Sequence, residues 1–303
     1  MPKELSRVLS AFSPDECEFQ RAVPLAQLTT FRIGGPCLAL ALPRTEEALG
    51  RLLSLLYSEG IPRIVIGNGS NLLAPDRGYP GVVISTRLLN KIFLCEQTIE
   101  AGAGASLSAV CREASRAGIG GFALLAGIPA TVGGALYMNA GAFGVTVGDL
   151  TASVRVLPST GGEPLVLSRE ECLFDYRRSV FDHRGLVVLG ATLTGDPIPV
   201  EQALSKEREI LEYRGRSHPL SLPSAGSVFR RPPGDYAGRL IEAAGLKGRS
   251  VGGAKVSPQH AGFIVNTGGA TATDVLTLVG VVRDTVKERF GVTLELEIEY
   301  LGE

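Results

Sequence analysis

The chain has 303 residues, which is enough for two or three domains with sizeable hydrophobic cores. Hydrophobic residues make up 45% of it and charged residues 20%, as in globular proteins that fold in water. Its net charge of −1 offers no electrostatic basis for binding nucleic acid or an anionic membrane surface, so we expect neither partner.

The five cysteines are scattered, odd in number and without a C-x-x-C pair. This usage argues against a disulfide framework and a zinc site, and it favours a reducing compartment. The N-terminal stretch M-P-K-E-L-S-R-V-L-S is too charged for a signal peptide. We therefore expect a cytoplasmic protein without a bound metal.

Helical and strand patterns alternate through the first two thirds of the chain. Thr45, followed by Glu46 and Glu47, predicts the capped start of an amphipathic helix that ends at Gly60. The next apolar runs predict strands on either side of a glycine-rich loop, which is an α/β arrangement. The strands are expected at 62–66, 81–85, 97–102, 152–157 and 185–193, and a helix at 106–118.

The stretch G-D-P-I-P at 195–199 has two prolines and breaks this pattern, so we place a domain boundary there. The predicted domains are 1–196, with subdomains of about 1–94 and 95–196, and 197–303. Beyond the boundary the periodicity predicts helices over 200–213 and 272–290. The closing run 293–301 alternates strictly between apolar and other residues, which predicts a half-buried strand.

Residues 117–148 carry no charge and form a stretch longer than a membrane span. They nevertheless contain nine glycines and Pro129, and they lack a dense run of Leu, Ile and Val. We therefore predict buried, irregular backbone around a ligand rather than a membrane helix. The polar backbone groups of such a segment must find partners.

The loop within I-V-I-G-N-G-S-N-L-L, residues 64–73, resembles a phosphate loop without completing a known motif. A Rossmann fingerprint would need a glycine where Leu72 stands, and the G-K-[ST] of a Walker loop is absent. A second partial match, Gly102-Ala103-Gly104, also lacks the third glycine. An isolated G-x-G is usually no more than a turn at the end of a strand.

Two features favour a ligand at this loop. Ser70 and Asn71 add side-chain donors to the backbone amides, which suits a diphosphate. The second uncharged, glycine-rich element begins some 60 residues after the loop. Two such surfaces suit a large pyrophosphate ligand held by N–H groups, and FAD fits better than ATP, for which Mg²⁺ and Lys are usual.

Five motifs in order carry a resemblance to a known family. They are the loop at 64–73, L-L-A-G-I-P-A-T-V-G-G-A-L-Y-M-N-A-G-A-F-G (124–144), Y-R-R-S-V-F (176–181), S-A-G-S-V-F-R-R-P (224–232) and V-G-G-A-K-V-S-P-Q-H-A-G-F-I-V-N (251–266). From about Thr29 onward the chain resembles the bacterial UDP-N-acetylenolpyruvoylglucosamine reductases (MurB) of peptidoglycan precursor synthesis.

The resemblance implies an α+β fold: an FAD-binding half of the vanillyl-alcohol-oxidase (PCMH) type, built of two α/β subdomains, and a C-terminal α+β substrate domain. It also implies that NADPH reduces FAD, whose N5 then gives a hydride to C3 of the enolpyruvyl group of UDP-N-acetylglucosamine enolpyruvate, while a proton goes to C2. The product is UDP-N-acetylmuramate. None of the three histidines lies in a glycine-rich element, so we expect non-covalent FAD.

The family's motifs carry its cofactor and substrate contacts over to this chain. Cofactor contacts are expected from Gly67, Asn68, Gly69, Ser70, Asn71, Leu72, Gly127, Ile128, Pro129, Thr131, Gly133, Gly134, Asn139 and Gly141. Substrate contacts are expected from Tyr176, Arg177, Arg231 and His260. Tyr176 is as well explained as a core residue, and His260 as a support of the substrate domain.

Arg177, Ser227 and Glu297 are the catalytic residues that the resemblance implies. Hydride attack builds enolate charge next to a carboxylate, and a cation such as Arg177 can stabilise it. Ser227 would deliver the proton to C2, and a protonated Glu297 would donate to the enolate. The residues alone leave open two solvated arginines at 177 and 178, a turn serine, and a polar outer face of an edge strand.

Two positions depart from the family's usual pattern. Ala130 stands where the family usually has Gly, and Arg230-Arg231-Pro232 stands where it often has K-N-P. An Arg at this place could still reach nucleotide phosphates. Only 49 residues separate Arg177 from Ser227, which resembles the shorter form of the family.

Two other functions remain open from the sequence. A flavin oxidase of the same fold could act on another alcohol or sugar, and a nucleotide-sugar-binding module would be colourless and inactive. We expect the reductase, acting as a monomer on a small-molecule UDP-sugar.

Overall fold

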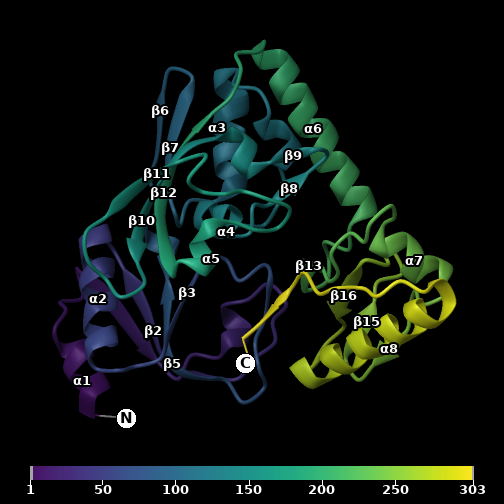
Figure 1. Cartoon of the computed structure of the whole chain (residues 1–303), viewed down its shortest axis with the longest axis horizontal. Helices are drawn as coiled ribbons and strands as arrows, with labels where there is room; N and C mark the ends of the chain where they lie inside the picture. Colours follow the sequence, from purple (N-terminus) through teal and green to yellow (C-terminus); the bar gives the residue numbers. More distant parts are fainter. Residues whose placement is uncertain (1–2, 302–303) are drawn as a thin grey trace. The chain divides into compact units, whose positions relative to one another are not determined.

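The computed structural model describes residues 3–301, apart from the side chain of Asp182, and they form two compact units. Unit 1 comprises Met1–Arg21, Leu38–Asn68 and Gly81–Tyr213. Unit 2 comprises Ala22–Cys37, Gly69–Pro80 and Arg214–Glu303. Figure 1 labels the elements of both units. The glycine loop at 67–71 therefore crosses from one unit to the other within its own length.

The first layer of unit 1 is a sheet with strand order β1-β2-β5-β3, covered by two helices. The strands are β1 (Cys17–Arg21), β2 (Cys37–Pro43), β5 (Tyr79–Ser85) and β3 (Arg63–Ile66), and the helices are α1 (Lys3–Ser10) and α2 (Glu46–Ser58). Helix α2 starts as predicted, because the Thr45 side chain accepts a hydrogen bond from the Ala48 amide. Strands β3 and β5 are parallel, with Ile66 opposite Ser85.

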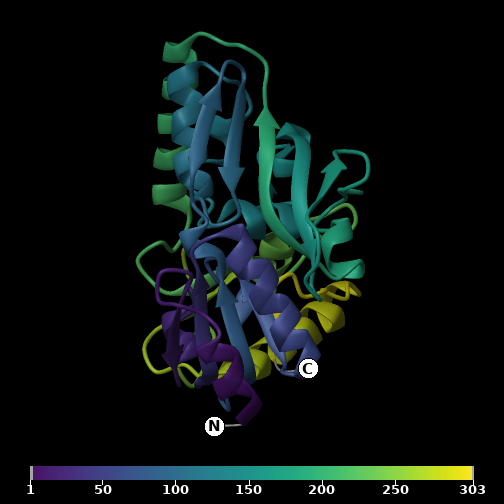
Figure 2. The ribbon, with the colours of Figure 1, turned by 90° about the vertical axis from the view of Figure 1, so that its left-hand side faces the viewer.

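The second sheet of unit 1 is antiparallel, with strand order β11-β10-β12-β7-β6. Its strands are β11 (Leu165–Ser168), β10 (Thr151–Pro158), β12 (Leu186–Thr194), β7 (Thr98–Gly102) and β6 (Ile92–Cys95). Figure 2 shows the hairpin of β6 and β7 beside the long strand β12. Helix α3 (Leu107–Ala117) ends at Gly118 in the left-handed conformation, as its glycine predicts. A short helix, α5 (Val180–His183), precedes β12.

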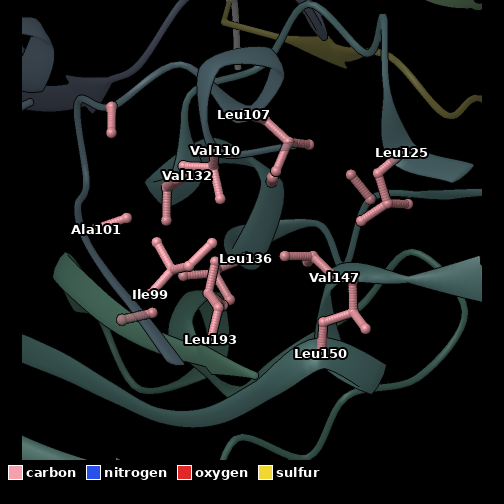
Figure 3. Close-up of a cluster of buried hydrophobic side chains, with 14 of the residues drawn as sticks. Ile99, Ala101, Leu107, Val110, Leu125, Val132, Leu136, Val147, Leu150 and Leu193 are labelled. Carbon is pink, nitrogen blue, oxygen red and sulfur yellow. The ribbon is translucent and has the colours of Figure 1, made fainter. Parts of the chain in front are cut away.

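The uncharged segment 117–148 folds as short, irregular elements, as predicted. They are the 3-10 helices η3 (Phe122–Leu125) and η4 (Val147–Leu150), helix α4 (Val132–Tyr137) and the hairpin β8 (Gly141–Ala142) and β9 (Val145–Thr146). Figure 3 shows its side chains Leu125, Val132 and Leu136 meeting Ile99 and Leu193 in the core. Within residues 3–301, no helix is both long and apolar enough to cross a membrane.

Residues 103–107 provide the partners that the polar backbone of this segment requires. The amides of Val132 and Gly133 donate to the carbonyls of Ala105 and Ala103, at 2.8 Å each. The Leu107 amide donates to the Ala130 carbonyl at 3.0 Å. These bonds remove the penalty that unpaired backbone groups would carry in a buried, glycine-rich segment.

Unit 2 contains an antiparallel sheet with strand order β13-β16-β15-β14. Its strands are β13 (Ser224–Ser227), β16 (Phe263–Asn266), β15 (Ala254–Val256) and β14 (Ser250–Val251), and its helices are α7 (Ala237–Ala243) and α8 (Ala272–Phe290). Figure 1 shows α8, in yellow, lying along β15 and β16. One face of α8 is buried at Val275, Leu278, Val279, Val282 and Val286, which is the helical periodicity that predicted it.

Asp76 ties segment 69–80 to the start of α8. Its carboxylate accepts hydrogen bonds from the amides of Ala272 and Thr273, at 2.7 and 3.1 Å, and from the Thr273 hydroxyl at 3.0 Å. A capping box between Thr271 and Asp274 satisfies further groups at the same helix end. The segment that follows the glycine loop is thereby fastened to a helix almost 200 residues later.

The prediction of one strand over 293–301 is wrong. Only β17 (Glu299–Tyr300) forms there, pairing in parallel with β4 (Leu72–Leu73), and Leu296 makes an isolated bridge to Phe229. The side chains do alternate, with Leu294 and Ile298 buried and Glu295 and Glu299 exposed. The run bonds first to residues 228–230 and then to 71–73, and this change of partner interrupts the ladder.

Helix α6 (Val200–Ser217) runs past its predicted end at 213, and the two compact units divide inside it, between Tyr213 and Arg214. The predicted domain boundary lies earlier, at 195–199. The compact units also assign segments 22–37 and 69–80 to the C-terminal unit. A functional division at residue 196 stays a prediction.

Two histidines of unit 2 lie together in an aromatic cluster. The ring centres of His218 and His260 are 5.4 Å apart, and Phe263 lies 5.4 Å from the first and 4.9 Å from the second. Burial, and then the charges of Arg214 and His260, lower the pKa of His218 to about 4. Burial also lowers the pKa of His260. Both rings are therefore neutral at pH 7.

We predict that Asp76→Ala lowers the free energy of unfolding by about 1 to 2 kcal/mol, because it removes a carboxylate cap from α8. Urea unfolding followed by circular dichroism measures the change. Asp15→Ala removes an exposed carboxylate from a turn of unit 1 and serves as the control. An equal loss in both variants would contradict this role of Asp76.

We predict that acidification below about pH 6.5, the ordinary His pKa, destabilises the protein through His218. The folded-state pKa is lower than the unfolded one, so between the two values the unfolded chain binds more protons and stability rises with pH. Urea midpoints of wild type and His218→Gln, measured from about pH 4.5 to about pH 7, test this. The variant should show a shallower pH dependence, and identical slopes would refute the assignment.

Candidate functional site

The glycine loop and the glycine-rich segment touch each other in unit 1. A Cβ atom on Gly67 would lie 2.1 Å from the Thr131 hydroxyl oxygen, so only glycine fits there. The Asn68 side-chain amide donates to the Pro129 carbonyl at 2.8 Å. Gly67 and Asn68 are half-buried, whereas Pro129 is exposed. Two predicted cofactor elements, some 60 residues apart, therefore form one uncharged surface.

The glycines of α4 are engaged inside the protein. The Gly133 amide donates to the Ala103 carbonyl at 2.8 Å, and the Gly134 amide donates to the Thr131 hydroxyl at 3.3 Å. A Cβ on Gly133 would lie only 3.0 Å from the Ala103 side chain. These two glycines therefore allow close packing, while Gly127 and Ile128 form the turn before the helix, with Gly127 at a φ of +78°.

Arg87 is a neighbour of this surface that the sequence reasoning missed. Its guanidinium donates to the Asn68 side-chain oxygen at 3.4 Å. Its Nε atom is buried and has no hydrogen-bond partner among residues 3–301. A signal existed: residues that follow the parallel strands β3 and β5 must emerge at the same sheet edge, and Arg87 follows β5 directly.

Arg177 lies in a tight turn, not in a strand as the expectation of opposite-facing arginines supposed. Asp175 and Arg178 exchange backbone hydrogen bonds, which leaves Tyr176 and Arg177 at the tip. Arg177 has a φ of +54°, a conformation that L-residues adopt rarely. Arg177 is half-buried and Arg178 exposed, so the structure still distinguishes the two.

Asn139 holds the Arg177 turn in place. Its side-chain amide donates to the Asp175 carbonyl at 2.9 Å and accepts from the Gly148 amide at 3.0 Å. The Arg177 guanidinium donates to the Gly141 carbonyl at 3.1 Å and reaches the Asn139 carbonyl at 3.5 Å. Two residues predicted to bind the cofactor thus support the predicted substrate arginine.

Ser227 ends strand β13 after a bulge. Ser224 lies opposite Val265 and Ser227 opposite Phe263, so three steps on one strand match two on the other. Gly226 makes the bulge possible with a φ of +78°. Ser227 itself is half-buried. Bulges of this kind redirect the side chain that follows them.

Glu297 lies directly beside the strand that carries Ser227. The Glu297 amide donates to the Val228 carbonyl at 2.8 Å. The Asn71 side-chain amide donates to the Glu297 carbonyl at 3.0 Å, which adds the glycine loop to the same assembly. Glu297 is half-buried, whereas Glu295 and Glu299 are exposed, in agreement with the choice of Glu297. Ser227, Glu297 and Asn71 all belong to unit 2, and Arg177 belongs to unit 1.

The remaining predicted contacts take different positions. Tyr176 is exposed, with the Arg177 guanidinium 5.1 Å from its ring centre. Arg231 is exposed and lies 4.1 Å from the ring centre of Tyr236. His260 accepts from the Gly262 amide at 3.1 Å within the aromatic cluster described above, which is a supporting role in the fold.

Comparison with known proteins identifies the family. A family model described as UDP-N-acetylenolpyruvoylglucosamine reductase, C-terminal domain, matches residues 218–301, and one described as FAD binding domain matches 37–167. Reductases of that name from Caldanaerobacter subterraneus subsp. tengcongensis and Moorella thermoacetica are 44% and 47% identical to the chain. The alignment covers 92% of this chain and 92% of each relative.

A solved structure agrees with these relatives. The crystal structure of UDP-N-acetylenolpyruvylglucosamine reductase (MurB) from Thermus caldophilus is 38% identical, with a TM-score of 0.79 over 94% of this chain and 98% of that one. The predicted α+β fold, with an FAD-binding domain of the vanillyl-alcohol-oxidase type and a C-terminal substrate domain, is thereby confirmed. The chain belongs to the UDP-N-acetylenolpyruvoylglucosamine reductase (MurB) family.

Proposed function

We propose that this protein is a cytoplasmic, NADPH-dependent flavoenzyme that reduces UDP-N-acetylglucosamine enolpyruvate to UDP-N-acetylmuramate for peptidoglycan synthesis. The observation that carries the proposal is the pairing of Ser227 and Glu297, which the bond between the Glu297 amide and the Val228 carbonyl makes neighbours. Both belong to the part of the chain that matches the reductase C-terminal domain. The family membership supports the same substrate class.

The surface around Gly67 fits a non-covalent FAD. It is uncharged, half-buried and lined by glycine, as the diphosphate of a dinucleotide requires for close approach of the backbone. Asn68, Ser70 and Thr131 add polar side chains, and Arg87 adds a guanidinium with an unpaired, buried Nε. We expect these residues and the amides of the loop to hold the cofactor, which supplies the hydride chemistry when bound.

Arg177 is suited to bind the substrate's carboxylate. Its guanidinium is held by two backbone carbonyls, which fix the plane in which its other N–H groups point. Charge that develops next to the carboxylate during the reaction would be stabilised by this preorganised cation. Tyr176, at the tip of the same turn, would contact the same substrate, and Arg231 its nucleotide phosphates.

Ser227 and Glu297 are suited to manage protons. We propose that the Ser227 hydroxyl delivers a proton to C2 of the enolpyruvyl group and that a protonated Glu297 donates a hydrogen bond to the enolate. The bulge before Ser227 and the bond at Glu297 fix both backbones. Their positions therefore need little reorganisation during proton transfer.

The absorption spectrum of the purified protein is the first experiment. We expect flavin absorption bands, and NADPH oxidation only after addition of the enolpyruvyl sugar. A colourless protein would indicate a binding module, and oxidation of other alcohols or sugars without NADPH would indicate an oxidase. Either result would overturn the proposed function.

We predict that Ser227→Ala leaves reduction of the bound flavin by NADPH nearly unchanged. Reoxidation by substrate should slow by about 10² to 10⁴, the usual contribution of a positioned proton donor. Stopped-flow absorbance resolves the two half-reactions. Ser224→Ala changes the other serine of the motif and is the control. If both half-reactions slowed equally, the role of Ser227 would be wrong.

We predict that Glu297→Gln lowers turnover far more than Glu295→Gln does. The two residues share a chain segment and a face, but only Glu297 is half-buried beside the Ser227 strand. Steady-state rates with saturating NADPH and substrate compare the two variants. Equal effects would mean that neither carboxyl has a specific role.

A further inference from the structure

Thr30 connects two segments of unit 2 that carry proposed functional residues. Its hydroxyl donates to the Ser224 carbonyl at 2.7 Å, across 194 positions of sequence. Its amide donates to the Gly69 carbonyl at 3.3 Å. One half-buried residue therefore joins the glycine loop to the start of the strand that ends at Ser227.

The same segments are joined again on the side of Glu297. The Asn71 side chain donates to the Glu297 carbonyl at 3.0 Å, and the Glu299 amide donates to the Asn71 carbonyl at 2.8 Å. The Glu297 amide donates to the Val228 carbonyl. Together with the two bonds of Thr30 these contacts form a closed circuit, which passes through the glycine loop, Thr30, strand β13 and the Glu297 run.

Two of the links in this circuit are made by side chains, the Thr30 hydroxyl and the Asn71 amide, and the others are backbone bonds. Thr30 is itself well anchored, because the buried Asn266 side chain donates to the neighbouring Phe31 carbonyl at 3.2 Å. The Asn266 amide also donates to the Pro223 carbonyl at 2.9 Å, next to Ser224. The threonine is therefore a fixed point against which the strand is held.

The strand needs such a fixed point because of its bulge. Between Ser224 and Ser227 the ladder to β16 is interrupted, and Gly226 has a left-handed conformation. Ladder bonds alone therefore do not set the position of Ser227. Its backbone is held at the Ser224 end by Thr30 and at the Val228 end by Glu297 and by a 2.9 Å bond to the Gly262 carbonyl.

We infer that Thr30 is a positioning residue, whose hydroxyl sets the strand of Ser227 relative to the glycine loop and to Glu297. The inference rests on the proposed function, because it assigns Thr30 to the step in which Ser227 gives up its proton. Thr30 does not itself touch the reacting atoms in this role. Displacing a reactive group by about 1 Å can slow a reaction by about 10²-fold, so one anchoring hydroxyl has a measurable effect.

The test compares Thr30→Val, which replaces the hydroxyl by a methyl group of similar size, with Thr30→Ser, which retains it. In the FAD-loaded protein, Thr30→Val should slow reoxidation by substrate by about 10- to 100-fold. Reduction by NADPH and the FAD content should stay near wild type, and Thr30→Ser should recover most of the lost rate. If Thr30→Val does not fold, Thr30→Ala takes its place.

Thr267→Val is the matched control, because the Thr267 hydroxyl also donates to a backbone carbonyl of unit 2, that of Gly253, at 2.9 Å. It lies outside the circuit and should leave both half-reactions unchanged. If Thr30→Val behaves like Thr267→Val, Thr30 is not a positioning residue. If Thr30→Val slows both half-reactions equally, the effect is structural and the inference fails as well.

Hydrogen exchange measured by mass spectrometry gives a readout that does not depend on turnover. Thr30→Val should increase exchange in residues 224–230 and 293–301 and leave that of helix α8 unchanged. An increase across all of unit 2, or no increase, would overturn the inference. If Ser227→Ala reacts like wild type, the proposed function fails; if Ser227→Ala is slow but Thr30→Val is not, only the inference fails.

Discussion

The hydrogen bond from the Glu297 amide to the Val228 carbonyl is the contact on which the proposed chemistry of unit 2 depends. It places the run around Glu297 beside the strand that ends at Ser227. The run then leaves that strand and bonds to Asn71 of the glycine loop. Because most of these bonds use backbone atoms, the two proton-bearing side chains keep their neighbours whatever residues surround them.

Unit 1 depends on a different constraint, the close approach that glycine allows. Gly67 lies against the Thr131 hydroxyl and Gly133 against Ala103, at distances that leave no room for a Cβ. These contacts bring two uncharged elements together and let their polar groups form one surface. A ligand diphosphate can approach such a surface closely because no side chain stands between it and the backbone.

Strained backbone concentrates near the proposed substrate arginine. Asn139, Phe143 and Arg177 all have positive φ, and none of them is glycine. Such conformations persist where surrounding contacts enforce them, often at functional sites. Here Asn139 supplies those contacts, since its side chain bonds to both Asp175 and Gly148. The strain is therefore consistent with a turn that presents Arg177 in one fixed orientation.

The sequence by itself determined the helices, most strands, the family and the residues to examine. Helix ends such as Thr45, Gly118 and the Thr271 capping box depend on bonds within a few residues, which local sequence records. Tertiary structure alone decided that 293–301 divides between two partners and that Thr30 bonds to Ser224. It also decided that Asn139 shapes the Arg177 turn. These contacts join residues 36 to 194 positions apart or more, and no local pattern encodes which distant carbonyl a donor will meet.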